Sequence, residues 1–281
     1  MPTPETISAA QAAPAARAAA PAFRQFPTAL RFALRNQARN RLAAVLLAVF
    51  VPVWYLLMMA LTSHTLVTFR LFATRQLLTV DGAHLTLISA GLNALTIITG
   101  FAVFHAVHTT LGFDRRLVFA GYRQATLITA KTLATGVLAI AVALYTGLVL
   151  LAFWRPDPAA WLAITGGYAV MSLTYGALGL LLGTAVRGDL EGFFLIIMGG
   201  LIDTFLQNPL GNPLANKPLL EWFPSFGPMQ FAVGGSFGRT FLLSHLALGL
   251  AWAAGFTVAG LVIFRFRTRS RTHPARPPAA S

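Results

Sequence analysis

The chain has 281 residues, of which 56% are hydrophobic and only 10% are charged. A soluble domain is about 25% charged, so this composition excludes an ordinary water-soluble fold. The formal charge of +13 would suggest nucleic-acid binding in a soluble protein, but its distribution along this chain indicates a membrane protein instead. The absence of cysteine excludes a disulfide framework and a thiolate metal site.

The N-terminal region divides into a tail and an amphipathic segment. Residues 1–22 are rich in Ala and Pro and lack the apolar core of a signal peptide, so they are predicted to be a disordered tail that is not cleaved. Within residues 23–41, Arg31, Arg35 and Arg39 recur every fourth residue on one helical face, and apolar side chains lie on the other. Such a helix would lie in the membrane interface, either as a plain anchor or with a specific mechanical role.

Apolar runs follow along the rest of the chain, and most of them approach or exceed the roughly 20 residues that cross a bilayer as a helix. Their apolarity is continuous rather than alternating, which favours helices over a closed barrel. The predicted fold is therefore an all-α integral membrane protein with six transmembrane helices. These helices are expected at residues 42–62, 85–109, 132–154, 161–186, 192–206 and 240–264.

The second run carries a polar stripe. Its members are spaced by three and four residues and therefore share one helix face. They are Thr86, Ser89, Asn93, Thr96 and Gly100. This face should avoid lipid, and it either borders a translocation path or packs against a neighbouring helix.

The segment between the second and third runs combines basic and aromatic residues. Asp114 is placed to cap a short helix, and Gly121 is placed to end it. Arg and aromatic residues are enriched where proteins bind one another, so this helix resembles a docking surface, the alternative being a plain basic turn. The candidate docking residues are Asp114, Arg115, Arg116, Phe119, Tyr122 and Arg123.

The fifth run is short and is followed by an unusual segment. Asp203 is the only acid inside a predicted span, which suggests either a functional role or capping at the end of the helix. Prolines in residues 208–218 prevent the helix from continuing. Residues 219–231 then mix aromatics with proline, which fits either an extracellular re-entrant segment or an aromatic loop at the outer surface.

Other motifs predict little chemistry. His105 and His108 lack the spacing and the Glu of a metalloprotease helix, and no Gly-x-Ser-x-Gly elbow occurs, so neither a metal site nor a catalytic site is predicted. Gly179 and Gly183 match a motif for close helix packing.

The distribution of positive charge predicts the orientation. Sixteen of the 21 Lys and Arg residues lie before the first run, after the second, fourth and sixth runs, and five lie on the opposite side. The positive-inside rule therefore predicts that both termini are cytoplasmic in a multi-pass protein of the cell membrane. Residues 266–281 are predicted to be a basic disordered tail.

These features, in this order around six spans, resemble the membrane permease of type-2 ABC exporters. In that family an amphipathic helix precedes the first span, a short cytoplasmic coupling helix joins the second span to the third, and re-entrant helices precede the last span. The matching segments here are 23–41, 113–123 and 218–237, with Phe-Pro-Ser-Phe-Gly-Pro at 223–228. The resemblance covers residues 23–265, which form the expected permease domain.

The resemblance implies a transporter subunit rather than an enzyme. The sequence contains no phosphate-binding loop of the G-x-x-x-x-G-K-[ST] type, so ATP and Mg are expected on a separate ABC ATPase chain that docks at the coupling helix. A second permease subunit, identical or related, and the lipid bilayer are the other expected partners, with no nucleic acid. The candidate path residues are Asn93, Thr96 and Asp203.

Two other classes remain open. An ion-coupled secondary transporter would carry inverted repeats and several ionisable groups within its spans. A non-transporting membrane scaffold or immunity protein would need neither a path nor an ATPase.

Overall fold

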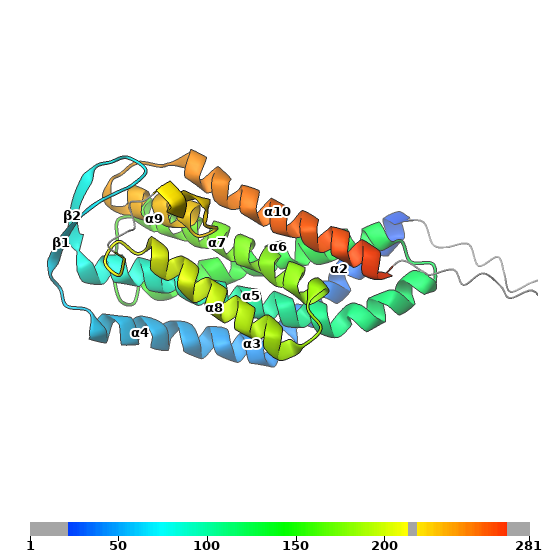
Figure 1. Ribbon diagram of the computed structural model, residues 1–281. Coiled ribbons are helices and arrows are strands. Elements are labelled where there is room, and N and C mark those ends of the chain that lie inside the picture. The colour runs from blue at the N-terminus through cyan, green and yellow to red at the C-terminus, as the bar shows by residue number, and fades with distance from the viewer. Residues whose placement is uncertain (1–21, 213–217, 269–281) are drawn as a thin grey trace, which may run out of the picture.

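The computed structural model describes residues 22–212 and 218–268, and these form a bundle of long helices with one β-hairpin (Figure 1). The elements in chain order are α2 (Ala22–Ala38), α3 (Arg41–Val45), the π-helical segment η1 (Leu46–Phe50), α4 (Val51–Leu61), β1 (Leu66–Arg70), β2 (Leu77–Asp81), α5 (Gly82–Phe119), α6 (Gln124–Leu150), α7 (Pro158–Ala185), α8 (Asp189–Gln207), the 3-10 turn η2 (Pro218–Trp222), α9 (Phe226–Phe237) and α10 (Leu243–Thr268). Of the two predicted tails, residues 1–21 and 269–281 lie outside the described residues. Helix α10 ends at Thr268, three residues after the predicted end of the permease domain at residue 265.

Five helices of the described chain are long and apolar enough to cross a membrane. They are Ala43–Leu61, Gly82–Phe119, Gln124–Leu150, Pro158–Ala185 and Leu243–Arg267. Their number and length indicate a multi-pass membrane protein, and each contains or closely overlaps a predicted span. The remaining predicted span, 192–206, lies within α8, which is not one of these five.

The long helices alternate in direction. Figure 1 shows α2 and the end of α10 at one end of the bundle, called here the α2 end, and the hairpin and α9 at the other, called the hairpin end. α7 arrives at the α2 end, and α8 runs back toward the hairpin end. It packs along α5, where Gly192 allows the close approach of the Phe104 ring.

Helices α5 and α7 form the centre of the bundle and approach each other closely. A Cβ atom added at Gly179 would lie 2.3 Å from the Gly100 carbonyl oxygen, and one at Gly183 would lie 3.0 Å from the Phe104 carbonyl oxygen. The predicted close packing at these glycines is therefore confirmed. Without side chains at these positions, the two helix backbones can touch.

Adding a methyl group at Gly179 should force α5 and α7 apart. We expect Gly179→Ala to lower the free energy of unfolding by about 1–3 kcal/mol, as overpacking does in cores. Gly199→Ala is the matched control, because nothing lies within 4 Å of a Cβ atom at that helical position. Unfolding of the purified protein in mixed micelles by increasing SDS, followed by circular dichroism, measures both. Equal stability of the two variants would contradict the close contact.

The first membrane helix is continuous from α3 to α4 but is widened in the middle. The π-helical turn η1 ends directly before Val51 and Pro52, which open α4. Proline has no backbone N–H and its ring crowds the preceding turn, so it disturbs the regular hydrogen-bond ladder there.

A hairpin joins the first two membrane helices and was not predicted. Strands β1 and β2 are antiparallel, with Leu66 opposite Asp81. Asp81 caps α5 by accepting a hydrogen bond from the Ala83 backbone N–H at 2.8 Å, and it also lies 2.8 Å from His64 Nδ1. Burial raises the pKa of Asp81, but the hydrogen bonds with His64 and Ala83 outweigh burial, so the pKa is lowered overall.

The chain between α8 and α10 contains η2 and α9, both within the predicted segment 218–237. Residues 226–235 of α9 are all buried. This short helix packs on α7, where a Cβ atom at Gly167 would lie 2.8 Å from Ala232 Cβ, and on α10, where one at Gly227 would lie 2.1 Å from the His245 carbonyl oxygen. Residues 213–217 of the proline-rich stretch lie outside the described part.

Candidate functional site

At the α2 end, helix α2 is fixed to the turn between α5 and α6. The Tyr122 hydroxyl donates to the Gln25 carbonyl oxygen at 2.6 Å, and the Arg123 backbone N–H donates to Gln25 Oε1 at 3.4 Å. The rings of Phe32 and Phe113 stack with centroids 5.6 Å apart. An apolar cluster joins the same elements and comprises Phe26, Ala29, Leu30, Leu117, Val118, Leu127 and Ala130.

These contacts define the α2–turn unit, residues 25–37 and 113–123. Ala29 and its apolar neighbours on α2 pack against α5 and α6. That this helix lies in the membrane interface stays a prediction. Burial raises the pKa of Tyr122, whose hydroxyl donates to the Gln25 carbonyl oxygen. A displacement of the turn would therefore be transmitted to α2.

The prediction of a separate short helix capped by Asp114 is wrong. Helix α5 continues without a break to Phe119, and Asp114 lies inside it, only 3% exposed. Its carboxylate pairs with Lys131 of α6 instead of capping, because backbone N–H groups within a continuous helix are already bonded. The predicted end of the helix is confirmed, since Gly121 has φ of 89° in the following turn.

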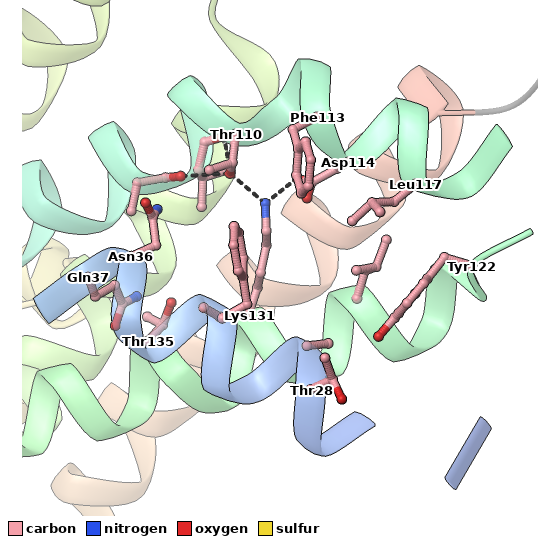
Figure 2. A pocket seen from close by; sticks show the side chains of 16 residues that line it. Thr28, Asn36, Gln37, Thr110, Phe113, Asp114, Leu117, Tyr122, Lys131 and Thr135 are labelled. Carbon is pink, nitrogen blue, oxygen red and sulfur yellow. Dashed lines mark hydrogen bonds and ion pairs between the residues drawn. The ribbon is translucent and has the colours of Figure 1, made fainter. Parts of the chain in front are cut away.

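The buried ion pair forms one wall of a cavity. Figure 2 shows Lys131 reaching between Thr110 and Asp114, and its ammonium group also donates to Thr110 Oγ1 at 2.8 Å. The cavity has a volume of about 220 Å³ and lies between α2, α5 and α6. Its other walls are largely apolar and include Phe32 and Leu127. The ion pair thus joins α5 to α6 directly beneath α2.

Removing one partner of this pair should be costly. Lys131→Met leaves the Asp114 carboxylate buried without a counter-charge, and we expect the free energy of unfolding to fall by about 3 kcal/mol. The double variant Asp114→Leu/Lys131→Met should recover most of that loss, since no charge is then left unpaired. SDS unfolding titrations of the three proteins measure the coupling. Additive losses in the double variant would show that the two side chains act independently.

The other predicted docking residues form an exposed surface at the same end. Arg115, Arg116 and Arg123 are exposed, and Phe119 is 68% exposed. Arg31 and Arg35 are exposed on α2, and Arg39 is exposed directly after its end. Tyr122 is partly buried in the α2–turn unit, so the predicted set divides into a buried part that holds the unit together and an exposed part that is free to contact a partner.

Asp203 of α8, near the hairpin end, forms hydrogen bonds with α7 and with the residue directly before α9. It is 3% exposed, and its carboxylate accepts hydrogen bonds from the Tyr175 hydroxyl of α7 at 2.6 Å and from the Ser225 backbone N–H at 3.0 Å. The Ser225 hydroxyl also donates to it. Gln207 Nε2 donates to the Leu220 carbonyl oxygen at 2.9 Å and fixes η2 to the same helix. These bonds tie the start of α9 to α7 and α8.

The polar stripe of α5 faces α8 and serves two purposes. Thr86, Ser89 and Asn93 line a cavity between α4, α5 and α8. Thr96 is fully buried and donates to the Asn93 carbonyl oxygen at 2.7 Å, and a Cβ atom at Gly200 would lie 2.5 Å from Thr96 Oγ1. Of the three predicted path residues, Asn93 lines this cavity, and Thr96 and Asp203 do not.

Sequence reasoning did not identify the partners of these acids. The Lys131 partner of Asp114 lies 17 residues away, about two turns into the next helix, and this spacing was a signal that could have been used. Tyr175 and Ser225 carry no comparable signal, because their proximity to Asp203 depends on how α7, α8 and α9 pack. Within residues 22–212 and 218–268, no group of three or more His, Cys, Asp or Glu side chains could hold a metal ion.

No protein-family model matches the chain, and no curated protein matches its sequence. A functional assignment therefore depends on the residues and their geometry.

Proposed function

We propose that the chain is the membrane permease subunit of an ATP-driven exporter of the type-2 ABC class. The observation that carries this proposal is the α2–turn unit, in which the helix before the first span is fixed to the turn between α5 and α6. The end of α5 presents Phe119, Arg115 and Arg116 on its exposed side, and the turn adds Arg123. An exposed aromatic among arginines is a composition typical of protein docking sites.

The proposed topology has six spans with both termini in the cytoplasm. Helix α7 arrives at the α2 end and α10 starts from the hairpin end, which supports α8 as the span that returns between them (Figure 1). The α2 end would face the cytoplasm, because sixteen of the 21 Lys and Arg residues belong to the segments on that side. The buried helix α9 would then be the re-entrant element at the outer surface of the cell membrane.

In the proposed mechanism, energy enters at the α2 end. ATP and Mg bind a separate ATPase chain that docks on the exposed part of the turn, since this sequence has no phosphate-binding loop of its own. Movement of the turn passes to α2 through Tyr122 and Gln25, and to α6 through Asp114 and Lys131. A second permease subunit completes the translocation path.

The bonding of Asp203 supports an ATP-driven mechanism over an ion-coupled one. A proton carrier needs an intramembrane carboxylate that gains and loses its proton. The Asp203 carboxylate instead accepts hydrogen bonds from Tyr175 and Ser225, which hold α9 in place. It thus has a structural role that requires no titration.

The docking proposal can be tested at one exposed side chain. We expect Phe119→Ala to weaken assembly with the ATPase by about 2 kcal/mol, the loss typical of an interface hot spot, without lowering stability, because Phe119 contributes little to the fold. The control is Phe266→Ala, since Phe266 is 67% exposed on α10 at the same end of the bundle. Affinity purification from native membranes, with quantification of any co-purifying chain that carries a phosphate-binding loop, measures assembly.

Two results would contradict the docking proposal. One is the recovery of no such ATPase with the unmodified protein. The other is equal recovery with the Phe119→Ala and Phe266→Ala variants, which would mean that the ATPase docks elsewhere.

The energy source separates the exporter from the ion-coupled alternative. In inside-out vesicles that contain the permease and its ATPase, export is measured as uptake of the substrate into the vesicle. This uptake should require ATP and should persist when an ionophore collapses the proton gradient. A catalytically inactive ATPase variant provides the control. Export that stops on collapse of the gradient while ATP is still present would favour the secondary transporter.

A further inference from the structure

Two of the side chains that line the cavity between α4, α5 and α8 carry a buried polar atom that has no hydrogen-bond partner among the described residues. Its volume is about 160 Å³. The side chains that matter for its chemistry are Trp54 from α4, Ser89 and Asn93 from α5, and Thr204 and Phe205 from α8. It lies on the polar stripe of the second membrane helix, on the side that faces α8.

The orientation of the Asn93 amide follows from its neighbour. The Thr204 hydroxyl donates its one proton to the Gly200 carbonyl oxygen at 2.7 Å, so it can only accept from Asn93, whose Nδ2 lies 2.7 Å away. The amide oxygen therefore points away from Thr204. Asn93 is 7% exposed, and among the described residues its Oδ1 atom has no hydrogen-bond partner.

Trp54 supplies the complementary group. Its indole Nε1 is buried and also lacks a hydrogen-bond partner among the described residues. The indole ring stacks on Phe50 with centroids 5.5 Å apart, which helps to hold it in position. One free donor and one free acceptor thus belong to side chains that line the same cavity. Buried groups of this kind are normally paired, and leaving both unpaired is costly.

The walls also limit the charge and size of a ligand. The described side chains lining the cavity are uncharged, and the nearby Asp203 carboxylate is engaged by Tyr175 and Ser225, so an ion would enter without a counter-charge. The volume is close to the roughly 150 Å³ of an apolar cavity that admits benzene. One water molecule, with a share of about 30 Å³ in the liquid, would fill only a small part of it.

We propose that this cavity binds an uncharged, ring-containing small molecule that carries a hydroxyl group. The hydroxyl oxygen accepts from Trp54 Nε1, the hydroxyl proton goes to Asn93 Oδ1, and the ring lies against Trp54 and Phe205. That this molecule belongs to the class of exported cargo rests on the proposed function. The binding itself does not.

Three probes of matched shape test the site. They are 4-(trifluoromethyl)benzyl alcohol, 4-(trifluoromethyl)toluene, which lacks the hydroxyl, and 4-(trifluoromethyl)benzoate, which is charged. Each is titrated by ¹⁹F NMR against the full chain in lipid nanodiscs, with empty nanodiscs as the blank. We expect the alcohol to bind roughly tenfold more tightly than the toluene, from two hydrogen bonds, and the benzoate not to bind above the blank.

Two variants and a control assign the effect to the cavity. Asn93→Leu removes the acceptor, and Trp54→Phe removes the donor while keeping an aromatic wall. Each should reduce the preference for the alcohol and leave the affinity for the toluene largely unchanged. Thr99→Val is the control on α5, because the Thr99 hydroxyl pairs with Ser172 at 2.7 Å and does not line this cavity.

The proposal is overturned if the alcohol and the toluene bind equally, if the benzoate binds as tightly as the alcohol, or if no probe binds above the blank. It is also overturned if both cavity variants keep the preference, or if Thr99→Val removes it equally. The assay contains no ATPase and no ATP. Probe binding without ATP-driven export would therefore reject the proposed function and keep the binding site. ATP-driven export without probe binding would reject the binding site and keep the proposed function.

Discussion

A polar group inside this bundle has to find its partner within the protein, because neither the apolar core nor the lipid offers one. Thr99 pairs with Ser172 across α5 and α7, and Asp203 gathers Tyr175 and Ser225 at the hairpin end. Each pairing ties two or more helices together. Apolar helices alone could slide past one another. The paired polar groups therefore fix the positions in which these helices pack.

Among the eight buried side-chain atoms of the described residues that lack a hydrogen-bond partner, two belong to side chains that line one cavity. Trp54 Nε1 and Asn93 Oδ1 lack partners among the described residues, although both lie beside helices that satisfy most of their other polar groups. An unpaired donor and an unpaired acceptor on side chains that line the same cavity are more informative than the polar stripe itself. Most of that stripe lies against α8, and Thr96 illustrates the ordinary packing use of a hydroxyl residue.

Hydropathy predicted the helices well, and it failed where tertiary contacts decide. The long apolar runs correspond to five membrane helices, and close packing at Gly179 and Gly183 follows from a local motif. Asp114 was interpreted as a helix cap from its local sequence alone, although its partner Lys131 lies 17 residues further on in α6. The hairpin was missed because its ten strand residues lie between two strong helical signals. Of the candidate site, the exposed arginines and Phe119 were predictable from composition, whereas the fixing of α2 by Tyr122 and Gln25 was not.

The Asp114–Lys131 pair also constrains how the sequence can change over evolution. A single substitution at either position leaves one charge of the pair without its partner at a site where Asp114 is only 3% exposed, so the protein with one change is less stable than the protein with neither change or with both. Neutral drift through single steps is thereby blocked at both positions. Residues 114 and 131 should therefore keep their charges or change together, whereas the apolar spans can exchange Leu, Val and Ile with little effect.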